Sequence, residues 1–398
     1  MIVLDQTLTA ALGVLSLLLG RFFNGKIRVL SRVCIPAPVT GGLVVSLLTL
    51  ALKSFAGIEF SFDFTIRDIC MLIFFTSIGF QCDLSTIKKG GRPLVSLIVL
   101  VAVLIVAQNF LAVGIAAAMN LEPVFGMVAG SVSMCGGHGT SAGFTDLMEK
   151  SGIINAGSIM MATATFGLIA GSLIGGPIAE ILITRRGLAP VVIDSGDMTE
   201  VNGERNDESP DARMRGYTLA TFEIFLTIGL GTLAGKLLSL TGISFPSYFG
   251  AMLCAIVIRN VADAVPGGAG IHAKEIGRIG SLCLALFLGI AMCSLRLWEL
   301  AGLALPLCLM LLSQVVFIFL FSIFIAFPLL GCDYNAAVLV SGLCGFGLGA
   351  TPNAMANMSS VCSRHGYINL PFIVVPIVGA AVLDIINITV ISLFINFI

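Results

Sequence analysis

Apolar runs long enough to cross or enter a lipid bilayer follow one another along the whole chain, with short polar loops between them. In the first half these runs cover residues 3–20, 35–52, 69–81, 93–119, 123–145 and 156–183. In the second half they cover residues 217–238, 246–258, 279–293, 302–328, 334–358 and 371–397. The order of long and short runs is the same in both halves. The pattern therefore predicts two related membrane repeats, 1–184 and 216–398, joined by a polar, flexible linker at 185–215.

The fifth run of each half repeats at the level of single residues. Glu122, Gly126, Gly130 and Thr140 match Asp333, Ala337, Ser341 and Thr351 at a constant offset of 211 residues. Both runs are interrupted by glycine, at 133–140 and at 345–353. Broken helices at matching positions of two halves are typical of the substrate site of a secondary transporter, because the freed backbone groups face a cavity there instead of lipid. Transport is therefore the leading functional hypothesis.

The positively charged residues indicate how the chain is threaded through the membrane. If both glycine-rich runs are re-entrant, each half has about five transmembrane helices, the halves have inverted topology and both termini are periplasmic. The inner loops then carry 16 of the 21 Lys and Arg residues, and the outer ones are Lys53, Arg67, Lys150, Lys236 and Arg296. If the glycine-rich runs cross fully, the count is 11 inside to 10 outside. The positive-inside rule thus favours re-entrant segments, with the short run 69–81 as the other candidate for the irregular element.

Composition places the chain among membrane proteins and excludes other classes. Of its 398 residues, 57% are hydrophobic and 11% are charged, and the mean hydropathy is +1.06. A net charge of −1 gives no basic surface for nucleic acid. The 11 cysteines are scattered and no histidine completes a metal site, so no cofactor is expected. Motifs such as HExxH and GxSxG are absent, so we do not expect an enzyme.

The two glycine-rich segments hold most of the residues expected to bind a ligand. Glycine permits close approach of the backbone, and amides and carbonyls without helical partners can bind an anion or a small cation. The predicted substrate-binding residues are Ser133, Gly136, Gly137, His138, Gly139, Thr140, Gly347, Gly349, Thr351, Asn353 and Asn357. The residues expected to hold a small coupling cation are Thr140, Ser141, Thr351, Asp384 and Asn387. Lysine and arginine lie in the loops, so helix N-termini or loop amides would have to bind a carboxylate.

Several of these residues have two interpretations. His138 is the only histidine inside an apolar run, and it is a candidate for substrate or loop contact and for proton transfer. Asn353 and Asn357 lie four residues apart on one helix face, where they either bind substrate or bond to freed carbonyls. Asp384 and Asn387 lie three residues apart in the last run, where an ionisable group needs a cation or a partner. We expect them to support a cation site.

The glycine-rich motifs also resemble those of a known family. Gly136-Gly137-His138-Gly139-Thr140 and the stretch from Gly345 to Met358 are similar to the bacterial sodium/glutamate symporter family, and the similarity covers nearly the whole chain. The resemblance implies sodium-driven uptake of L-glutamate across a bacterial inner membrane. It also implies a homodimer of inverted repeats, in which a transport domain slides against a scaffold in an elevator-like cycle.

Other functions are compatible with the residues alone. One is a proton- or sodium-coupled carrier of another organic anion or dicarboxylate, or a cation/proton antiporter, in which His138 or Asp384 titrates. Uptake that follows a pH gradient and ignores sodium would favour this class. Another is a channel or a membrane-embedded enzyme. Asp384 has no second intramembrane aspartate that would complete a protease pair, which disfavours the enzyme.

Overall fold

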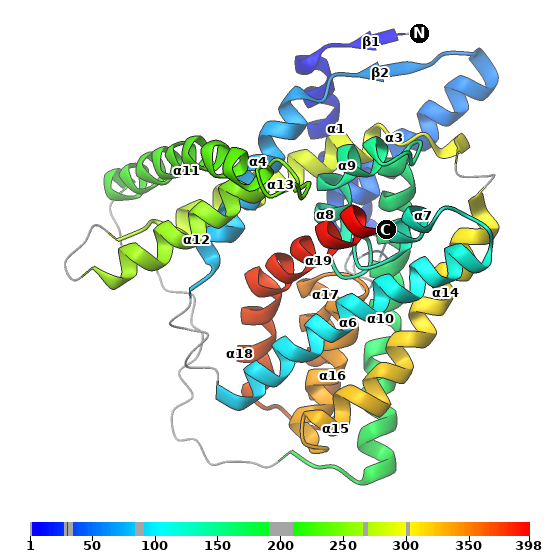
Figure 1. The fold of residues 1–398 in the computed structure, drawn as a ribbon, viewed down its shortest axis with the longest axis vertical. Helices are drawn as coiled ribbons and strands as arrows, with labels where there is room; N and C mark the ends of the chain where they lie inside the picture. The colour runs from blue at the N-terminus through cyan, green and yellow to red at the C-terminus, as the bar shows by residue number, and fades with distance from the viewer. Residues whose placement is uncertain are drawn as a thin grey trace.

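The computed structural model describes residues 2–27, 30, 35–83, 91–190, 210–265, 270–299 and 303–398, and these residues form a bundle of helices (Figure 1). Most of the predicted linker, 191–209, lies outside the described residues. The same holds for Arg28, Arg32, Lys88, Lys89 and Arg205 of the expected inner loops. The flanks of the linker are helical up to Arg186 and from Pro210 onward.

The first half contains long helices and one broken segment. The long helices are α1 (Gln6–Lys26), α3 (Ala37–Ala56), α4 (Thr65–Gln81), α6 (Gly91–Ala118) and α10 (Ala156–Arg186). Between α6 and α10 the chain forms α7 (Pro123–Gly126), the 3-10 turn η1 (Met127–Ala129), α8 (Gly137–Gly143) and α9 (Thr145–Lys150). Gly130, directly after η1, is extended and starts the break. The predicted run 123–145 is therefore several short helices.

The second half follows the same order. It begins with α11 (Pro210–Ser239), α12 (Phe249–Ala264), α13 (Ala273–Cys293) and the short 3-10 turn η2 (Leu297–Glu299). Two helices continue through one π-helical turn: α14 (Ala304–Phe321), η4 (Ser322–Ala326) and α15 (Phe327–Leu329) form one, and α18 (Leu370–Ile377), η5 (Val378–Val382) and α19 (Leu383–Phe397) form the other. Between them, α16 (Tyr334–Gly347) and α17 (Thr351–His365) form the broken segment.

The lengths of the helices fit a protein that crosses a membrane several times. Within the described residues, seven helices are long and apolar enough to span a bilayer: α1, α3, α6, α10, α11, α13 and the α14–α15 helix. The other expected spans are α4 and α12, with 17 and 16 residues, and the α18–α19 helix that the π-turn divides. The predicted class, a helical polytopic membrane protein, is confirmed.

One small sheet departs from the all-helical prediction. β1 (Ile2–Leu4) pairs in parallel with β2 (Phe60–Phe62), because the extended segments that lead into α1 and α4 run side by side. The first predicted run, 3–20, therefore starts as a strand. Asp5 follows the strand and starts α1 by accepting a hydrogen bond from the Leu8 amide at 2.8 Å.

The helices pack as two units, and each unit takes elements from both halves of the sequence. Unit A contains the first three long helices of each half, α1, α3, α4, α11, α12 and α13, in the upper part of Figure 1. Unit B contains α6 to α10 and α14 to α19, which pack mainly on one another. The units meet chiefly where α13 contacts α8 and where α4 contacts η5. The spatial division therefore cuts across the predicted repeats 1–184 and 216–398.

Glycines set the closest helix crossings of unit A. A Cβ added at Gly41 of α3 would collide with the carbonyl of Ser16 in α1. The α11–α12 crossing is built in the same way, since a Cβ at Gly250 would collide with the carbonyl of Gly231. Close backbone approach is a main source of helix association in a membrane, where the hydrophobic effect does not separate helices from lipid.

Replacing Gly41 by Ala should force α1 and α3 apart. We expect the protein in detergent micelles to lose about 1–3 kcal/mol of stability, the usual cost of overpacking, and to unfold at a lower temperature. A Cβ added at Gly25 of α1 would have no described atom within 4 Å beyond its own helix, so Gly25→Ala is the matched control and should not lower the unfolding temperature. Equal unfolding temperatures for Gly41→Ala and wild type would show that the crossing tolerates a side chain.

Candidate functional site

Each broken segment of unit B folds back on itself as a hairpin. In the second, the hydroxyl of Tyr334 at the start of α16 donates to the Gly366 carbonyl just beyond α17 at 2.6 Å, so the turn at Leu348–Ala350 forms the tip. In the first, a Cβ at Gly152 beyond α9 would lie 4.0 Å from Glu122 Oε2 before α7. Both hairpins thus begin and end close together, and their glycines lie at the tips.

The two tips touch inside the bundle. Gly137 has φ +57°, a left-handed conformation that strongly favours glycine, and an added Cβ would lie 2.8 Å from the Gly349 carbonyl oxygen. Gly167 of α10 packs so closely that a Cβ there would collide with the Leu348 carbonyl. The glycines of the two motifs are therefore needed for the contact between hairpins and with α10.

A cavity of about 300 Å³ lies at the tips, between unit A and unit B. Unit B contributes the polar wall, with both tips and Asp384 of α19. Unit A contributes an apolar wall, with Phe74, Phe75 and Ile78 from α4 and Leu284 and Leu288 from α13. The size is at the lower end of the range for small-molecule sites.

The structure divides the predicted site residues into two groups. The cavity is lined by Gly136, Gly137, His138, Gly139, Thr140, Gly349, Thr351 and Asp384. The other predicted residues, Ser133, Ser141, Gly347, Asn353, Asn357 and Asn387, do not line it. Five of these six belong to the hairpins, and their contacts lie within unit B. Whether any of them binds a ligand stays a prediction.

His138 is held by a hydrogen bond to α10. Its Nε2 lies 2.9 Å from Thr165 Oγ1, and that hydroxyl donates to the Met161 carbonyl at 2.8 Å. Because Thr165 has only one hydroxyl proton, His138 Nε2 carries the hydrogen and donates. In the neutral imidazole Nδ1 is then an acceptor, and His138 is one of the residues that line the cavity.

The asparagines of α17 bond to carbonyls of the glycine-rich helix α10. Asn353 Nδ2 donates to the Leu168 carbonyl at 2.8 Å, and Asn357 Nδ2 donates to the Gly171 carbonyl at 2.9 Å. Both acceptors belong to the continuous helix α10 and are not carbonyls freed at the break, so neither interpretation of the two asparagines is decided by these contacts. Gln108 of α6 donates to the Gly347 carbonyl at 2.8 Å, so a backbone carbonyl at the end of α16 has a hydrogen-bond partner.

Asp384 lines the cavity together with Thr140, Thr351 and Gly379. No hydrogen bond or ion pair joins its carboxylate to another described residue. Thr351 Oγ1 donates to the Gly379 carbonyl in η5 at 3.1 Å, beside the same cavity. One turn further along α19, Asn387 Nδ2 donates to the Ser131 carbonyl at 3.2 Å, and Asn387 Oδ1 is buried without a partner. An oxygen-rich site of this kind suits a small, hard cation.

The hydroxyls of Ser133 and Ser141 lie inside the first hairpin. Ser141 Oγ donates to Ser133 Oγ at 3.2 Å, and Ser133 Oγ donates to the Val128 carbonyl at 2.7 Å. Both residues are fully buried. Their hydrogen bonds connect α8 to the irregular stretch that precedes it, inside the first hairpin.

Sequence reasoning missed the unit A wall. Tyr248, at the start of α12, is fully buried, stacks on Phe75 with ring centroids 3.8 Å apart and has a hydroxyl without a partner. The third runs of the two halves, 69–81 and 279–293, supply α4 and α13, and both line the cavity. The sequence did contain a signal for this wall, because each of these runs is the third in its half. Equivalent elements of two repeats occupy equivalent positions in the fold.

Two broken helical segments that meet at glycine tips beside a cavity, in a bundle of helices long enough to span a membrane, are typical of secondary transporters. A family model described as sodium/glutamate symporter matches residues 2–367. The chain belongs to the sodium/glutamate symporter family. The resemblance seen in the glycine-rich motifs is thereby confirmed.

Individual relatives match along almost their entire length. The chain is 37% identical over 396 residues to the sodium/glutamate symporter of Escherichia coli (strain K12), which is 98% of this chain and 97% of the relative. It is 39% identical over 386 residues to the sodium/glutamate symporter of Haemophilus influenzae, which is 95% of this chain and 94% of the relative. These relatives are named as transporters, which confirms the expectation that the protein is not an enzyme.

Replacing Gly137 by Ala should separate the hairpin tips. The left-handed conformation costs a non-glycine residue roughly 1–2 kcal/mol, and the added Cβ also presses on the Gly349 carbonyl. We expect a lower unfolding temperature in detergent. Gly139→Ala is the control within the same motif, because its Cβ would make only an ordinary contact of 3.4 Å with Phe74. Equal losses in both variants would contradict the role of the tip contact.

Proposed function

We propose that this protein is a secondary active transporter that couples uptake of L-glutamate to sodium. The observation that carries the proposal is the cavity where both hairpin tips meet beside the Asp384 carboxylate. The names of the relatives supply the solute and the ion. Sodium acts as the coupling ion and is transported together with the substrate.

Backbone and hydroxyl groups bind the substrate in this proposal. The described residues that line the cavity include no lysine or arginine, so N–H groups at the starts of α8 and α17 and the hydroxyls of Thr140 and Thr351 receive the carboxylates. The ammonium group of glutamate donates to His138 Nδ1, which the bond to Thr165 leaves as an acceptor. His138 is then a substrate ligand and not a proton carrier.

Sodium binds on the α19 side of the cavity. Asp384 supplies the charge, and Thr140, Ser141, Thr351 and Asn387 supply neutral oxygens from the two hairpins and from α19. Sodium at Asp384 removes the repulsion between this carboxylate and those of the substrate. Each ligand therefore strengthens the binding of the other, by a coupling free energy of typically about 1–3 kcal/mol.

Inverted repeats are part of the same proposal. Contacts between the halves come in matching pairs: α3 packs on α13 as α12 packs on α4, and α6 packs on α19 as α14 packs on α10. With inverted topology the two hairpins are re-entrant from opposite sides, and both termini are periplasmic in a bacterial inner membrane. A homodimer, as the family resemblance implies, completes the assembly.

The division into units supports transport by an elevator-like movement. Unit B carries all the predicted ligands, and unit A faces them with apolar side chains of α4 and α13. Unit B can slide along such a wall with its ligands bound, because no polar group of the wall has to be released. Spectroscopic distances between the units that change on addition of sodium and glutamate would support this step.

The transport assay uses the purified protein in liposomes with radiolabelled L-glutamate outside. We expect saturable uptake with an inward sodium gradient and none with an equal potassium gradient. Uptake driven by a proton gradient without sodium would instead favour the proton-coupled carrier. No uptake of glutamate under either gradient, by protein that keeps its wild-type unfolding temperature, would leave the fold intact and contradict the proposed substrate.

Replacing Asp384 by Asn tests the sodium site. Because the charge that attracts sodium is lost, we expect the sodium concentration for half-maximal uptake to rise at least about tenfold, a loss of about 1.4 kcal/mol. Glu180→Gln is the control: this carboxylate pairs with His365 at 2.8 Å in unit B, away from the cavity. Unchanged sodium dependence in Asp384→Asn would remove Asp384 from the ion site.

A further inference from the structure

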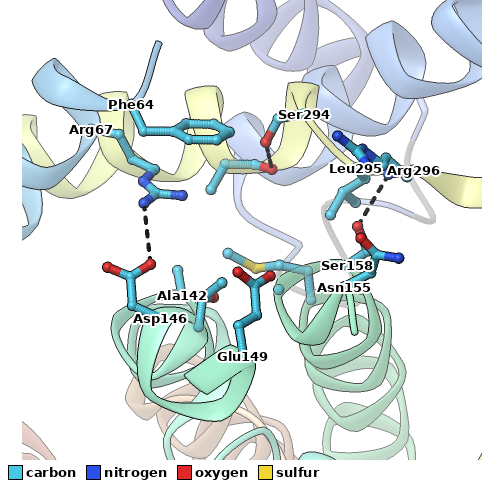
Figure 2. Close-up of a pocket in the computed structure, with 14 residues that line it drawn as sticks. Phe64, Arg67, Ala142, Asp146, Glu149, Asn155, Ser158, Ser294, Leu295 and Arg296 are labelled. Carbon is cyan, nitrogen blue, oxygen red and sulfur yellow. Dashed lines mark hydrogen bonds and ion pairs between the residues drawn. The ribbon is translucent and has the colours of Figure 1, made fainter. Parts of the chain in front are cut away.

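A second cavity between unit A and unit B is lined by charged side chains (Figure 2). It has a volume of about 260 Å³ and shares no residue with the cavity at the glycine tips. Unit A contributes Arg67 at the start of α4 and Arg296 just beyond α13, and unit B contributes Asp146 and Glu149 from α9. In Figure 2 the arginines lie above the cavity and the carboxylates below it, so opposite charges face each other across the boundary between the units.

Arg67 is fixed in unit A and reaches toward unit B. Its guanidinium pairs with Asp68 at 2.8 Å and stacks on Phe64, 4.1 Å from the ring centroid. Nη2 lies 3.9 Å from Asp146 Oδ1 (Figure 2). The Arg67 side chain is 11% exposed, whereas that of Asp146 is 68% exposed. The arginine is thus pre-positioned, and the carboxylate can move away into water at little cost in desolvation.

The neighbouring groups belong to the same charge cluster. Burial, and then the nearby Asp146, raises the pKa of Glu149, while Arg67 and Arg296 lower it. The Arg296 amide donates to Ser158 Oγ at the start of α10 at 3.1 Å, a second polar contact between the units (Figure 2). Glu149 therefore interacts with both arginines of unit A.

Another contact between the units lies at this end of the bundle. The Ser244 amide, between α11 and α12, donates to Asn396 Oδ1 near the end of α19 at 3.0 Å. Ser244 also lines a shallow pocket together with Leu147 and Lys150 of α9. The middle of the boundary, in contrast, is the apolar wall at the glycine tips. Polar contacts between the units are thus concentrated where α9 lies.

The other half of the sequence keeps the arginine but lacks the carboxylate. In the register that matches Thr140 with Thr351, Arg67 matches Arg278 and Asp146 matches Asn357. Arg278 Nη1 donates to the Tyr217 hydroxyl within unit A at 3.2 Å. Asn357 is uncharged and donates to the Gly171 carbonyl within unit B. Because Asn357 carries no charge, Arg278 and Asn357 do not form an ion pair with each other, in contrast to Arg67 and Asp146.

We propose that Arg67 and Asp146, supported by Glu149 and Arg296, form an electrostatic latch that holds unit B in the arrangement of this structure. The latch rests on the proposed sliding of unit B. A slide of more than a few ångström separates the charges, and water then solvates both. Since the matching positions at the other end carry no such pair, the latch favours one end state of the cycle over the other.

The test measures the distance between the units directly. Spin labels on genetically encoded reactive residues at Phe55 of unit A and Ile154 of unit B, both highly exposed, report the distance distribution without touching the native cysteines. In wild type without substrate we expect a major population with the distance of this structure and a minor one displaced from it. Asp146→Asn should lower the ratio of major to minor population by roughly two- to fivefold, the range for a partly exposed pair.

Further variants separate the latch from a general loss of stability. Asp146→Lys should lower the ratio further by repulsion, and Asp146→Glu should restore it. Asp263→Asn is the control, since it removes an ion pair with Arg259, at 2.7 Å, that lies within α12 of unit A. Molar salt should lower the ratio of major to minor population in wild type toward that of Asp146→Asn, because salt screens exposed charges. The ratio in Asp146→Asn itself should not change.

The outcomes separate the latch from the proposed function. Two populations whose ratio is the same in wild type, Asp146→Asn and Asp146→Lys would overturn the latch and leave the sliding intact. One fixed distance in every variant, with and without sodium and glutamate, would overturn the sliding and the latch together. Glutamate uptake in liposomes is measured in a separate experiment, and neither of these two conclusions depends on it.

Discussion

The interior of a membrane offers no water to backbone N–H and C=O groups, so every break in a helix creates polar groups that the protein has to satisfy itself. Both hairpins of unit B break at glycine. At the second break, Gln108 of α6 donates to the Gly347 carbonyl at the end of α16, and Asn353 and Asn357 donate to carbonyls of the continuous helix α10. These bonds fix the second hairpin against α6 and α10. Unit B also places polar groups at the cavity, at the two tips and at the Asp384 carboxylate.

This concentration of polar groups in unit B explains the character of unit A. Unit A meets the tips with Phe74, Phe75 and Leu288, and its helices are held together by glycine crossings such as Gly41 on Ser16. In the proposed site, an apolar wall strengthens the electrostatic interaction between a bound ion and Asp384, because it lowers the local dielectric constant. The described side chains of this wall are apolar and have no polar group that a relative movement of the units would have to release. Polar contacts between the units lie instead at the edge, near α9, where water can replace them.

The sequence predicts the elements and the position of the breaks well, because hydrophobic runs, glycine and the 211-residue repeat are local signals. Of the residues it predicts as ligands, His138, Thr140, Thr351 and Asp384 line one cavity, and their role as ligands stays a prediction. It could not predict that Ser141 bonds to Ser133 inside the hairpin, since which way a side chain points at a helix break depends on the tertiary contact of the tips. The division into units was missed for the same reason: α4 packs on α13 from the other half, and no periodicity within one run records that pairing.

The two repeats bring equivalent elements to the same cavity, and the positions at which they differ determine which polar groups the cavity contains. Thr140 and Thr351 match and place a hydroxyl on each side of the same cavity. The helices that follow the hairpins carry residues of different polarity at matching positions. Asp384 in α19 corresponds to Leu173 in α10, and Asn387 corresponds to Gly176. One helix therefore brings a charge and an amide to the tips, while the other brings small residues that let the hairpins approach. A symmetric site would hold two carboxylates, whose repulsion would raise the cost of binding an anion. A single charge leaves room for one cation and an anionic partner.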